Sequence, residues 1–362
     1  MKKILYVVTC LGMGGAERQV VDLADCFSKK GNEVKIAYLI EPSLVVPSSE
    51  NIEIVLLCRS RSMFGLVRGL FSFIALVRRF RPDVVHSHMY HANIFVRVSR
   101  FFIHFPKLIC TAHSNNEGGV GRMLIYRATD FLGDVFSNVS NIAVESFERK
   151  KAAPKKSMIT VYNGIDTERF KFNPLAREKV RSCLGLNNKK VFIAVGRLSV
   201  EKDYPNLILS FKCLTEKFPD ARLVIVGTGV EENNIRNLIR IESLENRVQM
   251  LGLRKDISEL LSAADIFVLS SSFEGFGLVV AEAMATNCYV VATDCGGVKE
   301  IVGNHGVLVK PGSVDEMSSA LIMAYNKDWE RIENDQCRDR IRRKFSLNSV
   351  VEQWDEIYAK SY

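Results

Sequence analysis

Short apolar runs alternate with longer segments of helical period along most of this 362-residue sequence. Brief apolar runs between turn residues are typical of buried strands, and apolar positions recurring every three to four residues are typical of helices. The expected strands lie at 3–9, 34–40, 52–57, 83–87, 107–112, 141–144, 158–161, 191–195, 222–226, 248–251, 265–269, 288–292 and 306–309. The expected helices include 15–29, 64–80, 122–137, 205–218, 231–245, 257–263 and 315–326. This alternation predicts an α/β fold whose parallel sheets are covered by helices on both faces.

The strand series restarts near residue 190, which indicates two domains. Turn pairs suited to a junction lie just before it: Asn163-Gly164, Asn173-Pro174 and Asn187-Asn188. We therefore predict two doubly wound domains, residues 1–165 and residues 166–345. Residues 346–362 have a helical pattern with no strand after them. They could cap the second domain or cross back onto the first, and we favour the crossing.

The composition, 47% apolar and 25% charged, is that of an ordinary globular protein. Nine scattered cysteines, never spaced CxxC, indicate reduced thiols in a cytosolic protein rather than a disulfide framework or a zinc site. The start MKKILYVVTC could pass for a secretory signal. Because no small-residue cleavage site follows and the glycines lead into an amphipathic pattern, we favour a first buried strand. We expect no transmembrane helix, since no apolar segment is long enough.

The net charge of +8 is concentrated in the first half of the sequence. Residues 1–165 hold 22 lysines and arginines against 13 acidic residues, whereas residues 166–362 hold 27 against 28. A basic surplus confined to one domain suggests an anionic partner there, such as a membrane surface or nucleic acid. Nucleic acid fits less well, because no motif of a known binding module accompanies the charge.

Two basic segments of the first half also carry apolar side chains. In residues 59–81, apolar positions 63, 66, 67, 70, 71, 74 and 77 recur at helical spacing. The arginines around them are Arg59, Arg61, Arg68, Arg78, Arg79 and Arg81. Residues 97–107 again combine arginine with phenylalanine. Such segments suit an interfacial helix on anionic lipid; equally, the apolar face could be core and the arginines solvated.

Glycines and cations follow two strands, at the edge where open α/β sheets bind ligands. Gly14 and Gly15 precede a helix whose N-terminus attracts anions, although the spacing is not GxGxxG and a simple turn would fit. Arg197 and Lys202 follow strand 191–195, where two cations suit a diphosphate. A solvated loop with a Glu201–Lys202 pair would fit that segment equally well.

Two glutamates flank a glycine-rich helix start in SSFEGFGLVVAEAMA, residues 271–285. Glu274 precedes the helix, and Glu282 lies within its apolar run. A buried carboxylate is costly unless something donates hydrogen bonds to it, so a protein partner or a ligand must satisfy Glu282. A ribose diol offers two donors to one carboxylate. With the similar turn CGGVKE at 295–300, the pattern indicates a nucleotide-shaped ligand.

These motifs, in this order and spacing, resemble retaining glycosyltransferase family 4 of the GT-B fold, and in particular bacterial enzymes of O-antigen and capsule synthesis. The matching segments are MGGAER, TAHS, YNGIDTERF, VGRL with Lys202, LVIVGTG, SSFEGFGLVVAEAMA and CGGVKE. The resemblance spans essentially the whole chain. It implies two Rossmann-like doubly wound domains facing across a cleft, with a nucleotide-sugar held mainly by the second.

The resemblance also implies a role for each matching residue of the second domain. Arg197 and Lys202 would bind the diphosphate and stabilise the leaving nucleotide as catalytic cations. Glu282 would take the ribose hydroxyls, and Glu274 would contact the donor sugar. Backbone groups that would help to hold the sugar and phosphate belong to Phe276, Gly277 and Leu278. The segment GTGVEENN lacks an Asp-Gly-Pro that many family members carry, which leaves the nucleotide contacts there open.

In the first domain the resemblance implies that Gly14 and Gly15 let their loop approach the diphosphate. His113 would lie beside the anomeric carbon, although a lone histidine after a strand is more often structural. The cluster His86, His88 and His91 could suggest a metal. No carboxylate or cysteine grouping completes such a site and no Asp-x-Asp ends a strand, so we expect neither a metal nor another cofactor.

We therefore expect a retaining glycosyltransferase that moves a hexose or N-acetylhexosamine from a nucleoside-diphosphate sugar, with UDP as the carrier. The acceptor would be a lipid-linked glycan or oligosaccharide in cell-surface polysaccharide biosynthesis. The enzyme would be cytoplasmic and peripheral on the inner face of the cytoplasmic membrane. Two alternatives remain: a nucleotide-sugar epimerase of the same fold, which needs further acid and base groups, and a non-catalytic sugar-nucleotide-binding protein.

Overall fold

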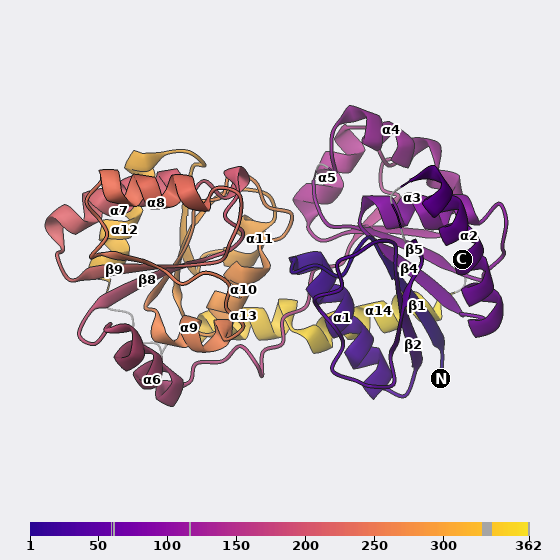
Figure 1. Ribbon diagram of the computed structural model, residues 1–362, viewed down its shortest axis with the longest axis horizontal. Coiled ribbons are helices and arrows are strands. Elements are labelled where there is room, and N and C mark those ends of the chain that lie inside the picture. Colours follow the sequence, from indigo (N-terminus) through magenta and orange to yellow (C-terminus); the bar gives the residue numbers. More distant parts are fainter. Residues whose placement is uncertain (59, 61, 116, 328–334, 361–362) are drawn as a thin grey trace. The chain divides into compact units, whose positions relative to one another are not determined.

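The computed structural model describes residues 1–58, 60, 62–115, 117–327 and 335–360, and the chain divides into two compact units (Figure 1). One unit comprises Met1–Gly164 together with Leu347–Tyr362, and the other comprises Ile165–Ser346. The junctions expected from the sequence lie one residue away from these.

The described residues of the first unit form a seven-stranded parallel sheet in the order β3-β2-β1-β4-β5-β6-β7. The strands are β1 (Lys3–Val8), β2 (Glu33–Tyr38), β3 (Glu53–Leu56), β4 (Val84–His88), β5 (Leu108–Ala112), β6 (Val135–Asn138) and β7 (Met158–Thr160). The helices are α1 (Gly15–Lys29), α2 (Met63–Phe80), α3 (Tyr90–Ser99), α4 (Val120–Ala128), the 3₁₀ turn η1 (Asp130–Leu132), α5 (Asn141–Arg149) and α14 (Leu347–Ala359).

The described residues of the second unit form a six-stranded parallel sheet in the order β10-β9-β8-β11-β12-β13. The strands are β8 (Lys190–Val195), β9 (Ala221–Val226), β10 (Val248–Met250), β11 (Ile266–Leu269), β12 (Tyr289–Thr293) and β13 (Gly306–Val309). The helices are α6 (Pro174–Leu184), the 3₁₀ turn η2 (Val200–Lys202), α7 (Tyr204–Lys217), α8 (Glu232–Ile241), α9 (Ile257–Ala263), α10 (Leu278–Ala285), α11 (Val298–Val302), α12 (Val314–Asn326) and α13 (Gln336–Phe345).

Both units are therefore Rossmann-like doubly wound α/β domains, which confirms the predicted fold class. In each sheet the strand order reverses once, between β1 and β4 in the first and between β8 and β11 in the second. The loops that follow these two strands leave toward opposite faces of the sheet, and the crevice between them is where such sheets bind ligands.

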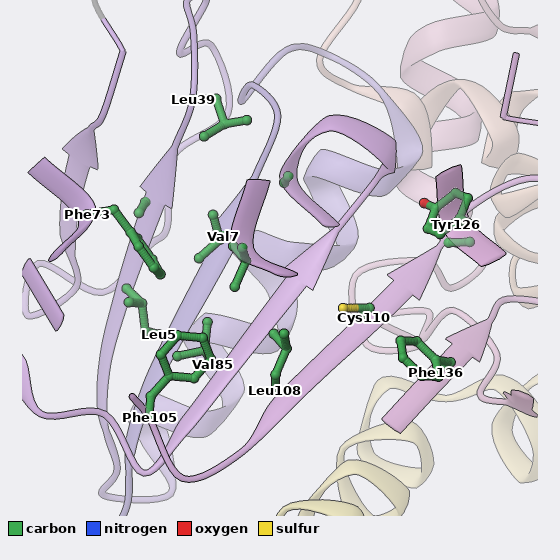
Figure 2. Packing of buried hydrophobic residues seen from close by; sticks show 14 of the residues in the cluster. Leu5, Val7, Leu39, Phe73, Val85, Phe105, Leu108, Cys110, Tyr126 and Phe136 are labelled. Atoms are coloured by element: carbon green, nitrogen blue, oxygen red, sulfur yellow. The ribbon is translucent and has the colours of Figure 1, made fainter. Parts of the chain in front are cut away.

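The first sheet is buried on both faces because successive side chains of a strand point to opposite sides. Leu5 and Val7 of β1 pack in one apolar cluster with Phe73 of α2 (Figure 2). Tyr6, between them in the sequence, packs on the other face in a cluster that contains Trp354 of α14. This double burial is why the strands read as continuous apolar runs.

Helix α14 follows the second unit in the sequence but packs within the first unit, where it contacts α1. Trp354 and Tyr358 are buried in it, and the Tyr358 hydroxyl lies 2.7 Å from Nδ1 of His86. The buried ammonium of Lys107 donates to the carbonyl oxygen of Ile357 at 2.6 Å. A cation is favoured there because the end of a helix carries partial negative charge.

Two predicted elements are wrong. Residues 141–144, expected as a strand, begin helix α5, because the side chain of Ser140 accepts a hydrogen bond from the N–H of Ala143 and caps the helix. The helix expected at 122–137 ends at Ala128, and Val135–Asn138 form the buried strand β6. Apolar residues on both sides of Gly133 imitate one helical pattern across that break.

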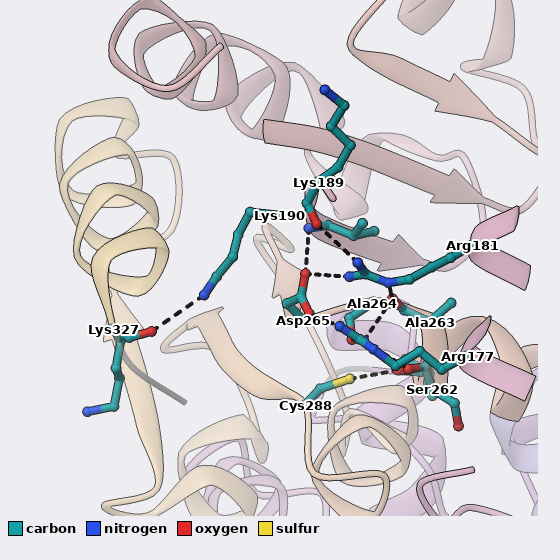
Figure 3. Close-up of polar contacts among 12 residues, drawn as sticks. Arg177, Arg181, Lys189, Lys190, Ser262, Ala263, Ala264, Asp265, Cys288 and Lys327 are labelled. Atoms are coloured by element: carbon teal, nitrogen blue, oxygen red, sulfur yellow. Dashed lines mark hydrogen bonds and ion pairs between the residues drawn. The ribbon is translucent and has the colours of Figure 1, made fainter. Parts of the chain in front are cut away.

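An ion cluster anchors the amino end of β11 (Figure 3). The carboxylate of Asp265 is paired with Arg177 at 2.5 Å and Arg181 at 2.7 Å, and accepts from the N–H of Val191 at 2.8 Å. Burial alone would raise the pKa of Asp265, but the two guanidinium groups outweigh it and the pKa is lowered. Both arginines also donate to Ala263 O at the end of α9, so one cluster fixes two elements.

Candidate active site

The second unit brings Lys202 and Glu274 together. Lys202 ends the turn η2 after β8, and Glu274 lies in the loop after β11, so they come from the two strands between which the order reverses. Lys202 Nζ lies 2.5 Å from Glu274 Oε1, and the two side chains are 18% and 12% exposed. Ser271 Oγ donates to the same Oε1 at 2.8 Å. A partly buried cation and anion thus share the edge of the sheet where a ligand is expected.

Ser270 and Ser272 connect the loop after β11 to the loop after β8 through hydrogen bonds. Ser270 Oγ donates to the carbonyl oxygen of Lys202 at 2.7 Å. The N–H of Ser272 donates to the carbonyl oxygen of Glu201 at 2.9 Å. A pocket at this point is lined by Ala194, Val195, Lys202, Tyr204, Val268, Leu269, Ser270 and Ser271. The site is therefore built on two tied loops and the ends of two adjacent strands.

Arg197 lies directly beyond β8 and is exposed, and its guanidinium makes no hydrogen bond or ion pair with the residues that the structure describes. Its backbone neighbours are held by the GTG segment after β9. A Cβ at Gly227 would lie 1.9 Å from the carbonyl oxygen of Gly196, and one at Gly229 would lie 2.1 Å from that of Leu198. These glycines allow backbone to pack on backbone and leave the guanidinium available to an anion.

The helix after the Glu274 loop begins at a glycine. Gly277 precedes α10 with φ +98°, a conformation that other residues adopt only with strain. Phe276 is buried, with its ring centroid 5.7 Å from that of Phe345, and Leu278 is half-buried. Glu282 is half-buried, because its apolar neighbours take the inward positions of α10. The carboxylate in the apolar run is therefore not a core residue.

In the first unit, Gly14 and Gly15 follow β1, and His113 follows β5. Gly14 caps helix α1, which begins at Gly15. A Cβ at Gly14 would lie 2.3 Å from Oε2 of Glu17. The Glu17 carboxylate therefore lies against the loop that the resemblance assigns to a diphosphate.

His113 is half-buried and lies in one cluster with two buried histidines, His86 and His88. His88 Nδ1 lies 2.9 Å from His113 Nε2, while the ring nitrogens of His86 lie 2.7 Å from the hydroxyls of Tyr358 and Thr111. Burial lowers the pKa of His113 to about 4. Burial, aided by the neighbouring histidines, also lowers the pKa values of His86 and His88 well below 6.5. All three rings are therefore neutral at pH 7.

Both ring nitrogens of His86 contact hydroxyl groups, and His88 contacts His113. Among the residues that the structure describes, His88 Nε2 and His113 Nδ1 are buried without a hydrogen-bond partner. His91 is exposed on α3. Within the described ranges, no group of three or more His, Cys, Asp or Glu side chains is placed to hold a metal ion.

The basic segments of the first unit divide into exposed and buried parts. Arg59 and Arg61 lie outside the described residues, and Arg68 is exposed on α2. Arg97 is 2% exposed, with its guanidinium carbon 4.3 Å from the ring centroid of Phe136. Lys107 is buried at the end of α14, so these two cations do not contribute to a basic surface.

Two contacts of the site were not predicted. Ser271 lies three residues before Glu274 and two residues after the apolar strand β11. This close spacing is the signal that could have paired their side chains. His86 and His88 alternate along β4, and the period of two puts them on one face of the sheet beside β5, which His113 directly follows. We interpreted that alternation as a possible metal site. In the structure the two side chains instead make hydrogen-bond contacts.

Two families match successive parts of the chain. Residues 176–344 match the family described as Glycosyl transferases group 1, and residues 13–169 match Glycosyltransferase Family 4. The two matches together take in almost all of both units. The chain belongs to these glycosyltransferases and is an enzyme that transfers glycosyl groups.

Two curated relatives act on lipid-linked acceptors according to their names. UDP-Gal:alpha-D-GlcNAc-diphosphoundecaprenol alpha-1,3-galactosyltransferase of Escherichia coli is 26% identical over 83% of this chain and 81% of its own length. N-acetylgalactosamine-N,N'-diacetylbacillosaminyl-diphospho-undecaprenol 4-alpha-N-acetylgalactosaminyltransferase of Campylobacter jejuni is 28% identical over 89% of each chain.

The fold is that of a solved protein from Anabaena, HepE, whose crystal structure contains UDP and glucose. The TM-score is 0.85 over 99% of each chain, at 21% identity. WaaG, a glycosyltransferase involved in lipopolysaccharide biosynthesis, gives a TM-score of 0.77 over 98% of this chain and 99% of its own, at 17% identity. These likenesses show that the fold is GT-B.

Proposed function

We propose that this glycosyltransferase moves a hexose or N-acetylhexosamine from a UDP-sugar to a lipid-linked glycan, with retention of the anomeric configuration, in cell-surface polysaccharide synthesis. The Lys202–Glu274 pair at the switch point of the second sheet carries the proposal. Its cation suits the diphosphate and its carboxylate suits the sugar hydroxyls. The E. coli relative supports the choice of donor and acceptor, because its name includes UDP-Gal and diphosphoundecaprenol.

Lys202 and Arg197 would act on the leaving group. The ammonium of Lys202 has three N–H donors, of which Glu274 takes one and leaves two for phosphate oxygens. The exposed guanidinium of Arg197 can bind phosphate through two parallel hydrogen bonds. As the bond from the anomeric carbon to the phosphate oxygen breaks, both cations stabilise the developing negative charge.

Retention follows if the acceptor oxygen forms its bond on the face that the phosphate leaves. The acceptor hydroxyl then gives its proton to the leaving phosphate oxygen, so no side-chain base is needed. We also propose that the reaction is independent of metal ions, because the two cations supply the charge on the diphosphate. EDTA should leave turnover unchanged.

We propose that helix α2 docks this enzyme on the inner face of the cytoplasmic membrane. Gly65, Gly69 and Phe73 lie on its buried face. On its outer side, Phe64 is 80% exposed and Phe71 is 67% exposed. The other exposed residues of that side include Met63, Leu66, Val67, Arg68, Arg78 and Arg79. Exposed aromatic and basic side chains on one helix suit an anionic lipid surface. The described helices include none long and apolar enough to span a membrane.

A transfer assay tests the proposed activity directly. The protein is incubated with UDP-glucose, UDP-galactose, UDP-N-acetylglucosamine or UDP-N-acetylgalactosamine and a short glycan on a lipid diphosphate, and parallel samples use the GDP-sugars. We expect one UDP-sugar to give a glycosylated lipid with an α linkage by NMR. Turnover of GDP-sugars alone, or a β-linked product, would contradict the proposal.

A further inference from the structure

The two oxygens of the Glu274 carboxylate have different surroundings. Oε1 accepts from both Lys202 Nζ and Ser271 Oγ, at 2.5 and 2.8 Å. For Oε2, no partner occurs among the residues that the structure describes. Because the side chain is 12% exposed, this oxygen is held near solvent with its capacity to accept hydrogen bonds unused.

Ser271 is itself held firmly. Its side chain is fully buried, and its carbonyl oxygen accepts from Thr293 Oγ1 of β12 at 2.6 Å. The backbone of Glu274 is fixed as well, since a Cβ at Gly296 would lie only 1.7 Å from the carbonyl oxygen of Glu274. The serine hydroxyl therefore reaches Glu274 from a rigid base on the neighbouring strands.

We infer that Ser271 is a positioning residue for Glu274: it fixes Oε1 so that Oε2 faces a hydroxyl of the donor sugar. Lys202 alone would not do this, because a flexible ammonium can pair with either oxygen or with both. Without the serine, the carboxylate would rotate about its pairing with Lys202, and Oε2 would no longer be held toward the sugar hydroxyl. The role rests on the proposed function, since it assumes a UDP-sugar in this site.

The test compares affinity for UDP with affinity for the UDP-sugar that the transfer assay identifies. We expect Ser271→Ala to leave the Kd for UDP within about twofold and to lower kcat/KM for the UDP-sugar roughly tenfold or more, since a hydrogen bond to a charged group is lost. Ser258→Ala is the matched control, because the Ser258 hydroxyl donates to the carboxylate of Glu259 on α9 at 2.9 Å and not to Glu274. It should match the wild type.

A double-mutant cycle separates positioning from general support of the loop. In a Glu274→Ala background, adding Ser271→Ala should change kcat/KM by less than about twofold, because the carboxylate it positions is gone. If Ser271→Ala does not fold, Ser271→Cys, with its weaker donor, replaces it in the same series.

Equal losses of UDP and UDP-sugar affinity, an unchanged kcat/KM, or additive effects in the cycle would overturn the role of Ser271 and leave the proposed function standing. A wild-type protein that binds no UDP would instead contradict the proposed function, and this role with it.

Discussion

At the scale of single residues, the proposed site combines partly buried charged side chains with one exposed cation. Lys202 retains donors beyond its contact with Glu274, and Arg197 is exposed. Glu282 is half-buried on α10. A partly buried charged group interacts more strongly with a charged or hydroxylated ligand than a fully solvated group does.

Glu282→Ala should weaken UDP binding about tenfold or more, because the ribose loses a charged acceptor. Isothermal titration measures this effect. Glu216→Ala is the control, since that carboxylate pairs with Lys212 on the surface of α7. An unchanged Kd in Glu282→Ala, with a lowered melting temperature, would show that the residue is structural.

The neutral histidines predict a loss of stability in mild acid. His113 has a folded pKa of about 4, below its unfolded value near 6.5, because burial disfavours the charged ring. Below pH 6.5 the unfolded chain binds a proton that the folded chain does not, so stability falls as the pH drops toward 4.

For His113 the full loss is roughly 3 kcal/mol, and His86 and His88 change stability in the same direction. Urea unfolding at pH 7 and pH 5 should show the decrease, and His113→Gln should reduce it. A wild-type stability that is equal at both pH values would contradict the assignment.

The sequence predicted a ligand site at Lys202 and Glu274 because both follow apolar strands and match a family motif. It did not identify the partner of either side chain. Ser271 pairs with Glu274 only because the loop turns back after β11, and the neighbouring Ser272 faces Glu201 instead. Which of two adjacent serines contacts Glu274 depends on the conformation of the loop. Loop residues lack the periodic pattern that helices and strands show in a sequence.

At the scale of helices and strands, the ion cluster of Asp265 lies at the amino end of β11, away from the proposed site. Asp265→Asn should cost about 3 kcal/mol, because two arginines lose a partly buried partner. The urea midpoint measures this loss. The Kd for UDP of the folded variant should be unchanged, because the site lies at the other end of β11.

The control for Asp265 is Asp294→Asn, which removes an exposed pair with Lys299 at 3.8 Å. A surface pair of this kind contributes less than about 1 kcal/mol. If both variants had the same midpoint as the wild type, the ion cluster would not stabilise β11.

Strands buried on both faces were predictable, since their apolar runs leave few alternatives. The buried face of α2 was not, because that helix is apolar on nearly every side. The burial of Gly65 and Gly69 permits close packing: a Cβ at Gly69 would lie 2.2 Å from Cys58 Sγ. Because α2 packs closely through its glycine face, the bulky side chains of Phe64 and Phe71 lie exposed on its other side. The spacing of apolar residues in the sequence did not reveal which face is buried.

At the scale of the whole molecule, the chain combines two domains with different surfaces. The basic surplus of the first half remains on the surface only in part, since Arg97 and Lys107 are buried. The two-domain organisation could be read from the restart of the strand series. The surface charge could not, because burial of a cation depends on partners such as Phe136 and the end of α14.

The exposed residues of α2 predict binding to anionic vesicles. The wild type should sediment with phosphatidylglycerol vesicles at low salt and much less with phosphatidylcholine. Phe64→Ser with Phe71→Ser should reduce binding several-fold, because two apolar anchors are lost. Leu175→Ser, which changes an exposed apolar residue of the second unit, should have no effect. Equal sedimentation of the wild type with both lipids would contradict the docking proposal.

The most direct test of the central claim is the turnover of the lipid-linked acceptor by Lys202→Ala. Removing a cation that stabilises a leaving group costs about a hundredfold or more in kcat. We predict such a loss with little change in melting temperature, while Lys212→Ala, which alters an exposed pair on α7, retains wild-type turnover. Turnover of Lys202→Ala within about twofold of the wild type would contradict the account, because Lys202 would then have no part in the transfer.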